Sequence, residues 1–163
     1  MTVLHVGCGR QRLPEFFGGC PEVRVDIDPA VDPDIVASMT SLGDIGTFVA
    51  VWCCHSLEHL HPHDGITALQ EFHRVLKPDG AAIIIVPDLE DVKPTDEVVY
   101  TSSAGPITGH DMYYGWRAHE NEHMQHRTGF VKSTLEAALQ KAGFARVDVK
   151  RGDGYQLVGT GWK

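Results

Sequence analysis

The sequence predicts an α/β fold with a Rossmann-like, doubly wound and mostly parallel sheet. Short apolar strands alternate with helical segments, which is typical of βαβ units. The last two predicted strands are separated only by the turn Gly152-Asp153-Gly154. Because no crossover helix fits in so short a connection, this pair must be antiparallel. The 163 residues are enough for one hydrophobic core, and we expect a single domain over residues 1–163.

Each predicted strand is a short apolar run that ends at a turn. The first ends at Gly7, the second at Asp28-Pro29, and the run FVAVWCC is continuously apolar, as central parallel strands tend to be. The predicted strands cover residues 3–6, 23–27, 34–37, 48–54, 81–86, 146–149 and 156–159.

Helices are predicted between these strands. Residues 63–76 carry apolar side chains near every 3.6 residues, and we expect this stripe to face the core: Ile66, Leu69, Phe72 and Leu76. Pro78-Asp79-Gly80 is expected to end this helix, and residues 12–17 to form a brief one. Ser133 is expected to cap a last helix that Gly143 ends. The long segment 88–128 is expected to be a functional loop or lid over an acceptor site.

The composition excludes several classes of protein. The formal charge is −8 and the 14 basic residues are scattered, so we expect no nucleic-acid partner. No apolar run approaches the roughly 20 residues of a membrane span. Met1 leads directly into a strand, so no signal peptide is expected. Two of the four cysteines, Cys53 and Cys54, are strand neighbours that point to opposite faces, which indicates reduced thiols and a cytoplasmic location.

The clearest functional feature is the glycine turn after the first strand. Gly7 and Gly9 allow positive φ and close approach of a ligand to the backbone. Asp26 ends the neighbouring strand, where its carboxylate can accept two hydrogen bonds from a ribose diol. These features predict a site for an adenosine-containing cofactor. A dinucleotide site would have a third glycine near position 12, where this sequence has Arg12, and this disfavours NAD.

Five segments resemble the class I S-adenosylmethionine-dependent methyltransferases, particularly the small type 11 group: VLHVGCG, VRVDIDP, VWCCHSLEHL, EFHRVLKPDG and AAIIIVPDL. The resemblance is close over residues 3–89 and looser over 130–163. It implies a sheet of order 3-2-1-4-5-7-6 with strand 7 antiparallel. It also implies S-adenosylmethionine as the cofactor and methyl transfer as the activity.

Carried over by position, the resemblance implies a role for particular residues. Gly7, Cys8 and Gly9 would lie under the methionine moiety. Asp26 would bind the ribose and Ile27 the adenine, while His55 would lie beside the cofactor. Ser38 and Met39 occupy the place where relatives often carry an acid facing the adenine amine. Glu58 and His59 begin the LEHL turn near the methyl group.

The sequence also departs from the family pattern. Gln11 replaces the third turn glycine, and Ser38 stands where an acid is common. The chain starts at the first strand, without the helices that often cover the cofactor. We therefore expect the central segment or a second subunit, as in a homodimer, to close the pocket.

Several polar and aromatic residues are candidates for handling a small-molecule acceptor with an O, N or S nucleophile. Histidine titrates near neutral pH, so His59 is a candidate general base or substrate contact; alternatively it only caps its turn. The segment GHDMYYGWR supplies Tyr113 as a second catalytic candidate. It also supplies further acceptor contacts that join Glu58: His110, Tyr114 and Trp116. Its aromatic rings would alternatively bury the segment against the sheet.

Three other functions stay open. The sequence HENEH at 119–123 matches the zinc motif H-E-x-x-H, with Glu120 as a base, but no third ligand is clearly placed and we expect no metal. The second alternative is an NAD-dependent oxidoreductase. The third is a non-catalytic subunit that binds S-adenosylmethionine.

Overall fold

The structure, a computed structural model, describes residues 1–102, 105–116 and 122–163. Its main feature is a seven-stranded sheet of order β3-β2-β1-β4-β5-β9-β8. β9 pairs antiparallel with β5 and with β8, and the other neighbours are parallel. The predicted order and the antiparallel seventh strand are confirmed. The strands are β1 (Val3–Val6), β2 (Glu22–Asp26), β3 (Ile35–Val36), β4 (Phe48–Cys54), β5 (Leu76–Pro87), β8 (Arg146–Gly152) and β9 (Gln156–Trp162).

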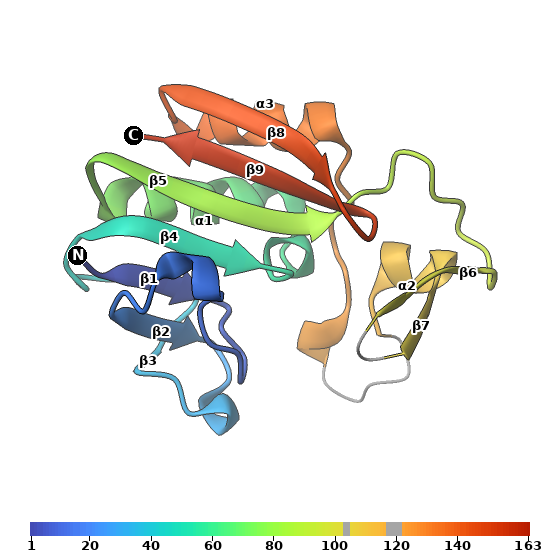
Figure 1. Ribbon diagram of the computed structural model, residues 1–163, viewed down its shortest axis with the longest axis horizontal. Coiled ribbons are helices and arrows are strands. Elements are labelled where there is room, and N and C mark those ends of the chain that lie inside the picture. The colour runs from blue at the N-terminus through green and yellow to red at the C-terminus, as the bar shows by residue number, and fades with distance from the viewer. Residues whose placement is uncertain (103–104, 117–121) are drawn as a thin grey trace.

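Two helices cover one face of the sheet. α1 (Pro62–Val75) and α3 (Lys132–Ala142) contact each other behind the strands in the view of Figure 1. Leu69 and Phe72 of the stripe predicted for α1 are buried in the core, as are Leu135 and Leu139 of α3. Ile66 is only half-buried, and Leu76 is buried but belongs to β5. Phe72 of α1 and Leu135 of α3 are among the largest buried side chains of this core.

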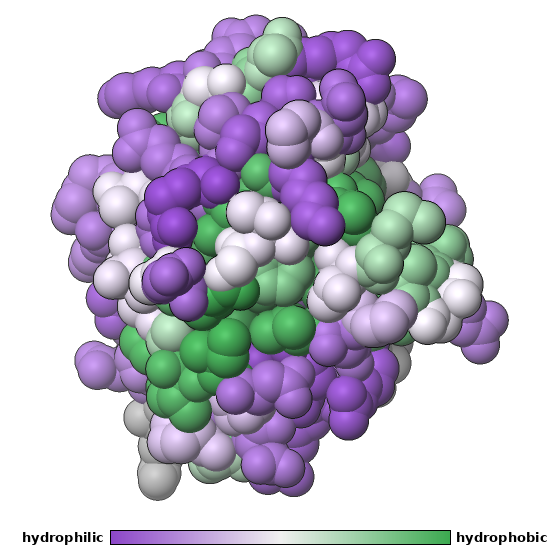
Figure 2. Space-filling view, turned by 90° about the vertical axis from the view of Figure 1, so that its left-hand side faces the viewer, coloured by the Kyte–Doolittle hydropathy of each residue, from purple (hydrophilic) through white to green (hydrophobic). Residues whose placement is uncertain are grey.

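The opposite face has a much thinner cover. The helix expected at 12–17 is a single 3₁₀ turn, η1 (Glu15–Phe17), in front of the sheet in Figure 1. The rings of Phe16 and Phe17 pack edge-on against Trp52 of β4, at centroid distances of 5.6 and 5.7 Å. Phe16 is still largely exposed, and hydrophobic side chains also reach the surface on the side where the parallel strands begin, which faces the viewer in Figure 2.

Two helix boundaries differ from the predicted ones. α1 ends at Val75, before the Pro78-Asp79-Gly80 turn, because Leu76 already pairs with Phe48 of β4. The expected cap at Ser133 is wrong, since α3 begins at Lys132 and Val131 precedes it. The hydroxyl of Thr134 accepts the Val131 N–H at 3.0 Å and so performs the capping from the third helical position.

The segment between β5 and α3 is more ordered than a lid loop. It forms a hairpin of β6 (Val98–Ser102) and β7 (Gly105–Thr108), then the helix α2 (Gly109–Tyr114) and the turn η4 (Glu122–Met124). A capping box between Thr108 and Asp111 starts α2. A small cluster of its own holds the segment together, centred on Leu89, Val92 and Met112. The segment lies beyond the carboxyl ends of the parallel strands (Figure 1).

The inserted segment is anchored to the sheet at its beginning and its end. Arg151 of β8 forms ion pairs with Asp88 and, at 2.8 Å, with Asp91. The Leu89 N–H donates to the Phe130 carbonyl at 3.0 Å. Among the described residues, no helix has the length and apolar character needed to cross a membrane.

Candidate functional site

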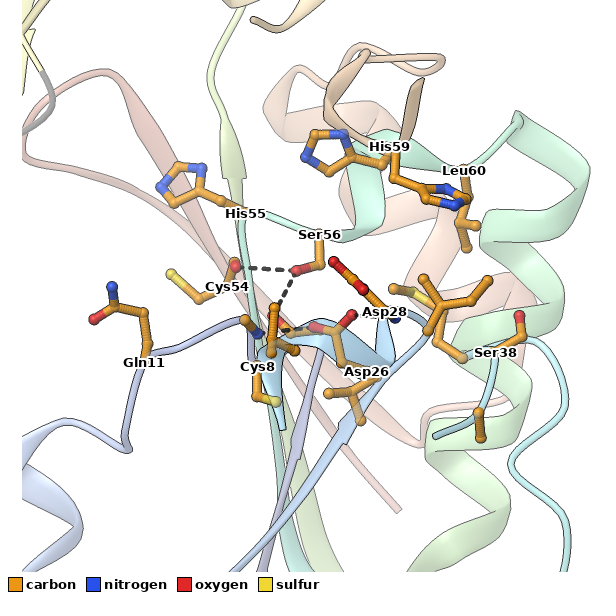
Figure 3. Close-up of a pocket in the computed structure, with 18 of the residues that line it drawn as sticks. Cys8, Gln11, Asp26, Asp28, Ser38, Cys54, His55, Ser56, His59 and Leu60 are labelled. Atoms are coloured by element: carbon orange, nitrogen blue, oxygen red, sulfur yellow. Dashed lines mark hydrogen bonds between the residues drawn. The ribbon is translucent and has the colours of Figure 1, made fainter. Parts of the chain in front are cut away.

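A cavity of about 350 Å³ opens at the carboxyl ends of β1, β2 and β4 (Figure 3). Its volume falls in the range of small-molecule sites, and its place is where open α/β sheets bind ligands. All eight residues that the sequence assigns to a cofactor line it: Gly7, Cys8, Gly9, Asp26, Ile27, Ser38, Met39 and His55. His59 lines it as well.

The glycine turn forms one wall of this cavity. Gly7 has φ +63°, and a Cβ atom there would lie 2.2 Å from Ser56 Oγ. That hydroxyl lies 3.1 Å from the Gly7 carbonyl oxygen and 3.2 Å from that of Cys54. The side chain of Ser56 thus occupies the space that any larger residue at position 7 would need.

Asp26 joins the turn to the end of β2. Its carboxylate accepts the N–H of Gly9 at 2.8 Å and the N–H of Asp28 at 3.0 Å. A carboxylate has about four lone-pair sites, so these two bonds leave acceptor capacity toward the cavity. The same side chain can therefore hold the turn in shape and bind a ligand hydroxyl.

Arg24 holds the glycine turn through hydrogen bonds to backbone carbonyls. The sequence analysis did not identify this residue. Its buried guanidinium donates to the Gly9 carbonyl at 2.6 Å and to the Asp32 carbonyl at 2.7 Å. An arginine inside the apolar run VRV was the available signal, because a buried cation must find partners. Arg24 links the turn to the loop after β2.

The end of the cavity assigned to adenine is mainly apolar. Ile27 is 49% exposed, which is unusual for a large apolar side chain beside a cavity and leaves surface for a ligand to cover. Ala37, Val31 and Met39 add further apolar lining. The Ser38 hydroxyl is hydrogen-bonded to the Thr40 hydroxyl at 2.8 Å, within its own loop.

The opposite end of the cavity carries histidines. His55 has φ +50°, a strained conformation for a residue with a side chain, and its Nδ1 lies 3.4 Å from Oε1 of Glu58. Partial burial lowers the pKa of His55, but the neighbouring Glu58 carboxylate and the Gln156 side chain together raise it by more, so the net shift is upward. Burial, with the Glu58 charge, raises the pKa of the Cys54 thiol to about 11, so this thiol stays protonated.

The four other predicted residues of the central segment do not line this cavity. Tyr113 and Tyr114 line a second cavity of about 450 Å³ together with His126. It shares no lining residue with the first cavity, and the two come near each other where the rings of His59 and His126 lie 4.9 Å apart. The Tyr113 hydroxyl donates to the Val92 carbonyl at 3.0 Å. His110 pairs with Asp96 at 2.8 Å, and Trp116 is exposed. Glu58 lies buried behind the wall formed by His55 and His59.

Some lining residues were not singled out by sequence reasoning. They are Asp28, Ser56, Leu60 and Met124, with His123 noted only as part of the zinc motif. His123 and Met124 belong to η4, so the inserted segment contributes to the cavity. Of the HENEH motif, His119 and Glu120 lie outside the described residues.

Comparison with known proteins decides the family. A family model described as a methyltransferase domain matches residues 1–149. The chain belongs to this methyltransferase family. No curated protein has a significant sequence match to this methyltransferase.

Solved structures share the fold of this methyltransferase at low sequence identity. A Burkholderia thailandensis 1,6-didemethyltoxoflavin N1-methyltransferase, with bound 1,6-didemethyltoxoflavin and S-adenosylhomocysteine, has a TM-score of 0.65 and 20% identity over 99% of this chain and 70% of its own. A glycopeptide N-methyltransferase complexed with S-adenosylmethionine has a TM-score of 0.67 and 13% identity over 98% and 85%. The S-adenosylmethionine-dependent methyltransferase SibL has a TM-score of 0.67 and 17% identity over 99% and 50%. The chain thus spans only half of SibL.

Proposed function

We propose that the protein transfers a methyl group from S-adenosylmethionine to a small-molecule acceptor with an O, N or S nucleophile. The observation that carries the proposal is the cavity in which the glycine turn faces the Asp26 carboxylate. Two proteins of the same fold were crystallised with this cofactor or its product, and one of them also with bound 1,6-didemethyltoxoflavin. The net charge of −8 also favours a small molecule over a nucleic acid.

In this proposal the cofactor lies along the carboxyl ends of β1 and β2. The free lone pairs of Asp26 accept the ribose hydroxyls, and Ile27 and Met39 cover the adenine. Gly7 and Gly9 let the backbone approach the amino-acid tail. Each role uses a group that already borders the cavity.

The cofactor supplies an electrophilic methyl group, so the chain's task is to place a nucleophile about 3 Å from it and to exclude water. His59 borders the cavity and lies across it from Asp26 in Figure 3, and we propose that it meets the acceptor. Its ring lies 4.9 Å from that of His126, measured between centroids. The second cavity, of Tyr113, Tyr114 and His126, is the proposed space for the rest of the acceptor.

Calorimetric titration with S-adenosylhomocysteine tests the cofactor site. Asp26→Ala should weaken binding at least about tenfold, because hydrogen bonds to a charged group contribute roughly 1.5–3 kcal/mol each. Asp148→Ala is the matched control, since this exposed acid lies on β8 at the far edge of the sheet. NAD, titrated in parallel, should not bind.

Equal affinity of the wild type and Asp26→Ala would refute the ribose assignment. Asp26 also holds the glycine turn, so thermal unfolding of the variant is measured beside the titration. Binding of the product without turnover across a broad panel of hydroxyl, amine and thiol acceptors would instead favour a non-catalytic subunit.

A further inference from the structure

A buried carboxylate that accepts no hydrogen bond from the described residues lies next to the acceptor end of the cavity. Glu58 is 1% exposed, and neither of its oxygens receives a hydrogen bond from a described residue. Its closest ion-pair partner among the described residues is the half-exposed His55, whose Nδ1 lies 3.4 Å from Oε1, and a buried ionised carboxylate is costly unless cations neutralise it. Its oxygen and one nitrogen each of His59 and His126 all lie within 4.8 Å of one another.

Both imidazoles are oriented as metal ligands usually are. Nδ1 of His59 lies 3.1 Å from the Gln125 carbonyl oxygen, and Nδ1 of His126 lies 2.9 Å from that of Met112. Because a carbonyl oxygen only accepts, each Nδ1 carries the proton and each neutral ring keeps its Nε2 lone pair. Metal-binding histidines characteristically donate their other nitrogen to such a partner. Nε2 of His126 lies 4.0 Å from Oε1 of Glu58.

The backbone holds the two halves of this cluster together. Glu58 and His59 belong to η3 (Leu57–His59), whereas His126 follows η4 in the inserted segment. The N–H groups of Arg127 and Thr128 donate to the Glu58 carbonyl at 2.8 and 3.0 Å. The Thr128 hydroxyl donates to the Leu60 carbonyl at 2.6 Å. These hydrogen bonds hold the backbone that follows His126 against η3, and His126 therefore lies near Glu58.

We propose that Glu58, His59 and His126 bind a divalent transition-metal ion, with Zn²⁺ as the reference ion. One carboxylate and two imidazoles form a donor set that zinc and iron enzymes use with a position left open for substrate. In a tetrahedral site, bonds of about 2.0–2.2 Å place two ligand atoms about 3.3–3.6 Å apart, so binding needs the ligand atoms to approach one another by at most about 1.5 Å. This site differs from the HENEH motif and departs from the expectation of no metal.

The role of the ion rests on the proposed function. His59 borders the cofactor cavity and His126 the second one, so an open position on the ion faces the space proposed for the acceptor. An acceptor oxygen bound there is held near the methyl group, and the ion lowers the pKa of a bound hydroxyl. His59 then acts through the ion and does not itself take the proton.

Calorimetric titration of the chelator-treated full chain with ZnCl₂ tests the site. One ion per chain should bind, and His126→Gln should bind it at least about tenfold more weakly, the lower bound for losing even an outer partner of a ligand. His63→Gln is the matched control, because this side chain is 80% exposed and lies outside the cluster. Titrations with Fe²⁺, Mn²⁺ and Mg²⁺ identify the preferred ion, and Mg²⁺ should bind weakest.

Absence of saturable binding by the wild type, or equal affinity in His126→Gln, would overturn the proposal. Circular dichroism checks that each variant is folded; if His126→Gln is not, His59→Gln decides in the same way. S-adenosylhomocysteine is titrated separately in the presence of chelator. Product binding without metal binding refutes only the metal site, and metal binding without product binding refutes only the methyltransferase proposal.

Discussion

The two ends of the cavity are built in different ways. At the cofactor end, backbone groups of the turn after β1 meet the end of β2, and the Gly9 N–H bonds to Asp26 only 17 positions along the chain. At the acceptor end, side chains from η3 meet a segment more than 60 positions away, as the contact of His59 with Gln125 shows.

The cofactor end is defined by the shape of its backbone, whereas the acceptor end is defined by a buried charged group. At the cofactor end, the side chains of Ser56, Asp26 and Arg24 form hydrogen bonds to backbone groups of the glycine turn and so hold its conformation. The acceptor end contains the Glu58 carboxylate, which has no hydrogen bond from a described residue. We therefore expect changes at the cofactor end to disturb folding and changes at the acceptor end to be tolerated.

The largest effect is expected from Gly7→Ala. Its φ of +63° costs a residue with a side chain about 1–2 kcal/mol, and the collision with Ser56 adds about 1–3 kcal/mol of overpacking. The variant should lose about 2–5 kcal/mol of unfolding free energy in urea, and with it affinity for S-adenosylhomocysteine.

Gly18→Ala is the matched control for that substitution. Gly18 has a φ of +61° but no atom within 4 Å of an added Cβ. It should lose only the conformational part, about 1–2 kcal/mol. Equal losses in the two variants would show that the collision with Ser56 contributes nothing.

A smaller effect of opposite sign is expected from Glu58→Gln. In chelator, the neutral amide avoids burying a charge whose closest ion-pair partner is the half-exposed His55, so the variant should gain about 1–2 kcal/mol and unfold about 2–8 °C higher. Glu90→Gln, an exposed change in the same part of the chain, should leave the unfolding temperature unchanged. A lower unfolding temperature for metal-free Glu58→Gln would refute the expectation that changes at the acceptor end are tolerated.

The smallest effect concerns pH at the cofactor end. His5 of β1 is 2% exposed, and burial lowers its pKa despite the nearby Glu22. The unfolded chain therefore binds a proton more readily near pH 6.5 than the folded chain does. The contribution of His5 to stability is complete above that pH and is lost as the pH falls below it.

Urea unfolding at pH 7.5 and pH 5.5 measures this contribution. His5→Gln should lose less stability between the two pH values than the wild type, whereas the exposed His63→Gln should match the wild type. An identical pH dependence in wild type and His5→Gln would show that His5 is not a source of acid sensitivity.

Much of the cofactor end could be predicted because its signals are local. A strand, two glycines and an acid at the next strand's end lie within residues 3–26, and all eight assigned residues border the cavity. Arg24 was missed because its partners are carbonyl oxygens, which have no sequence signature. The roles assigned to these residues stay predictions.

The acceptor end could be predicted only in part. His59 was selected by its motif, but nothing in the sequence indicated that the ring of His126 would lie beside it. Tyr113 was chosen as an aromatic residue in a presumed loop, whereas the segment folds around its own small core and its hydroxyl bonds to Val92. A local pattern cannot show which side chains of such a segment face a cavity.

The sequence by itself determined the antiparallel last strand and the glycine turn, because hydrophobic periodicity and glycine conformation act over a few residues. The order of the sheet was implied by the resemblance to the methyltransferases. The tertiary structure alone decided that Glu58, His59 and His126 meet. Their contact depends on how the inserted segment bonds back to η3, through the N–H groups of Arg127 and Thr128. Such long-range contacts arise from packing and chain closure, which no short stretch of sequence encodes.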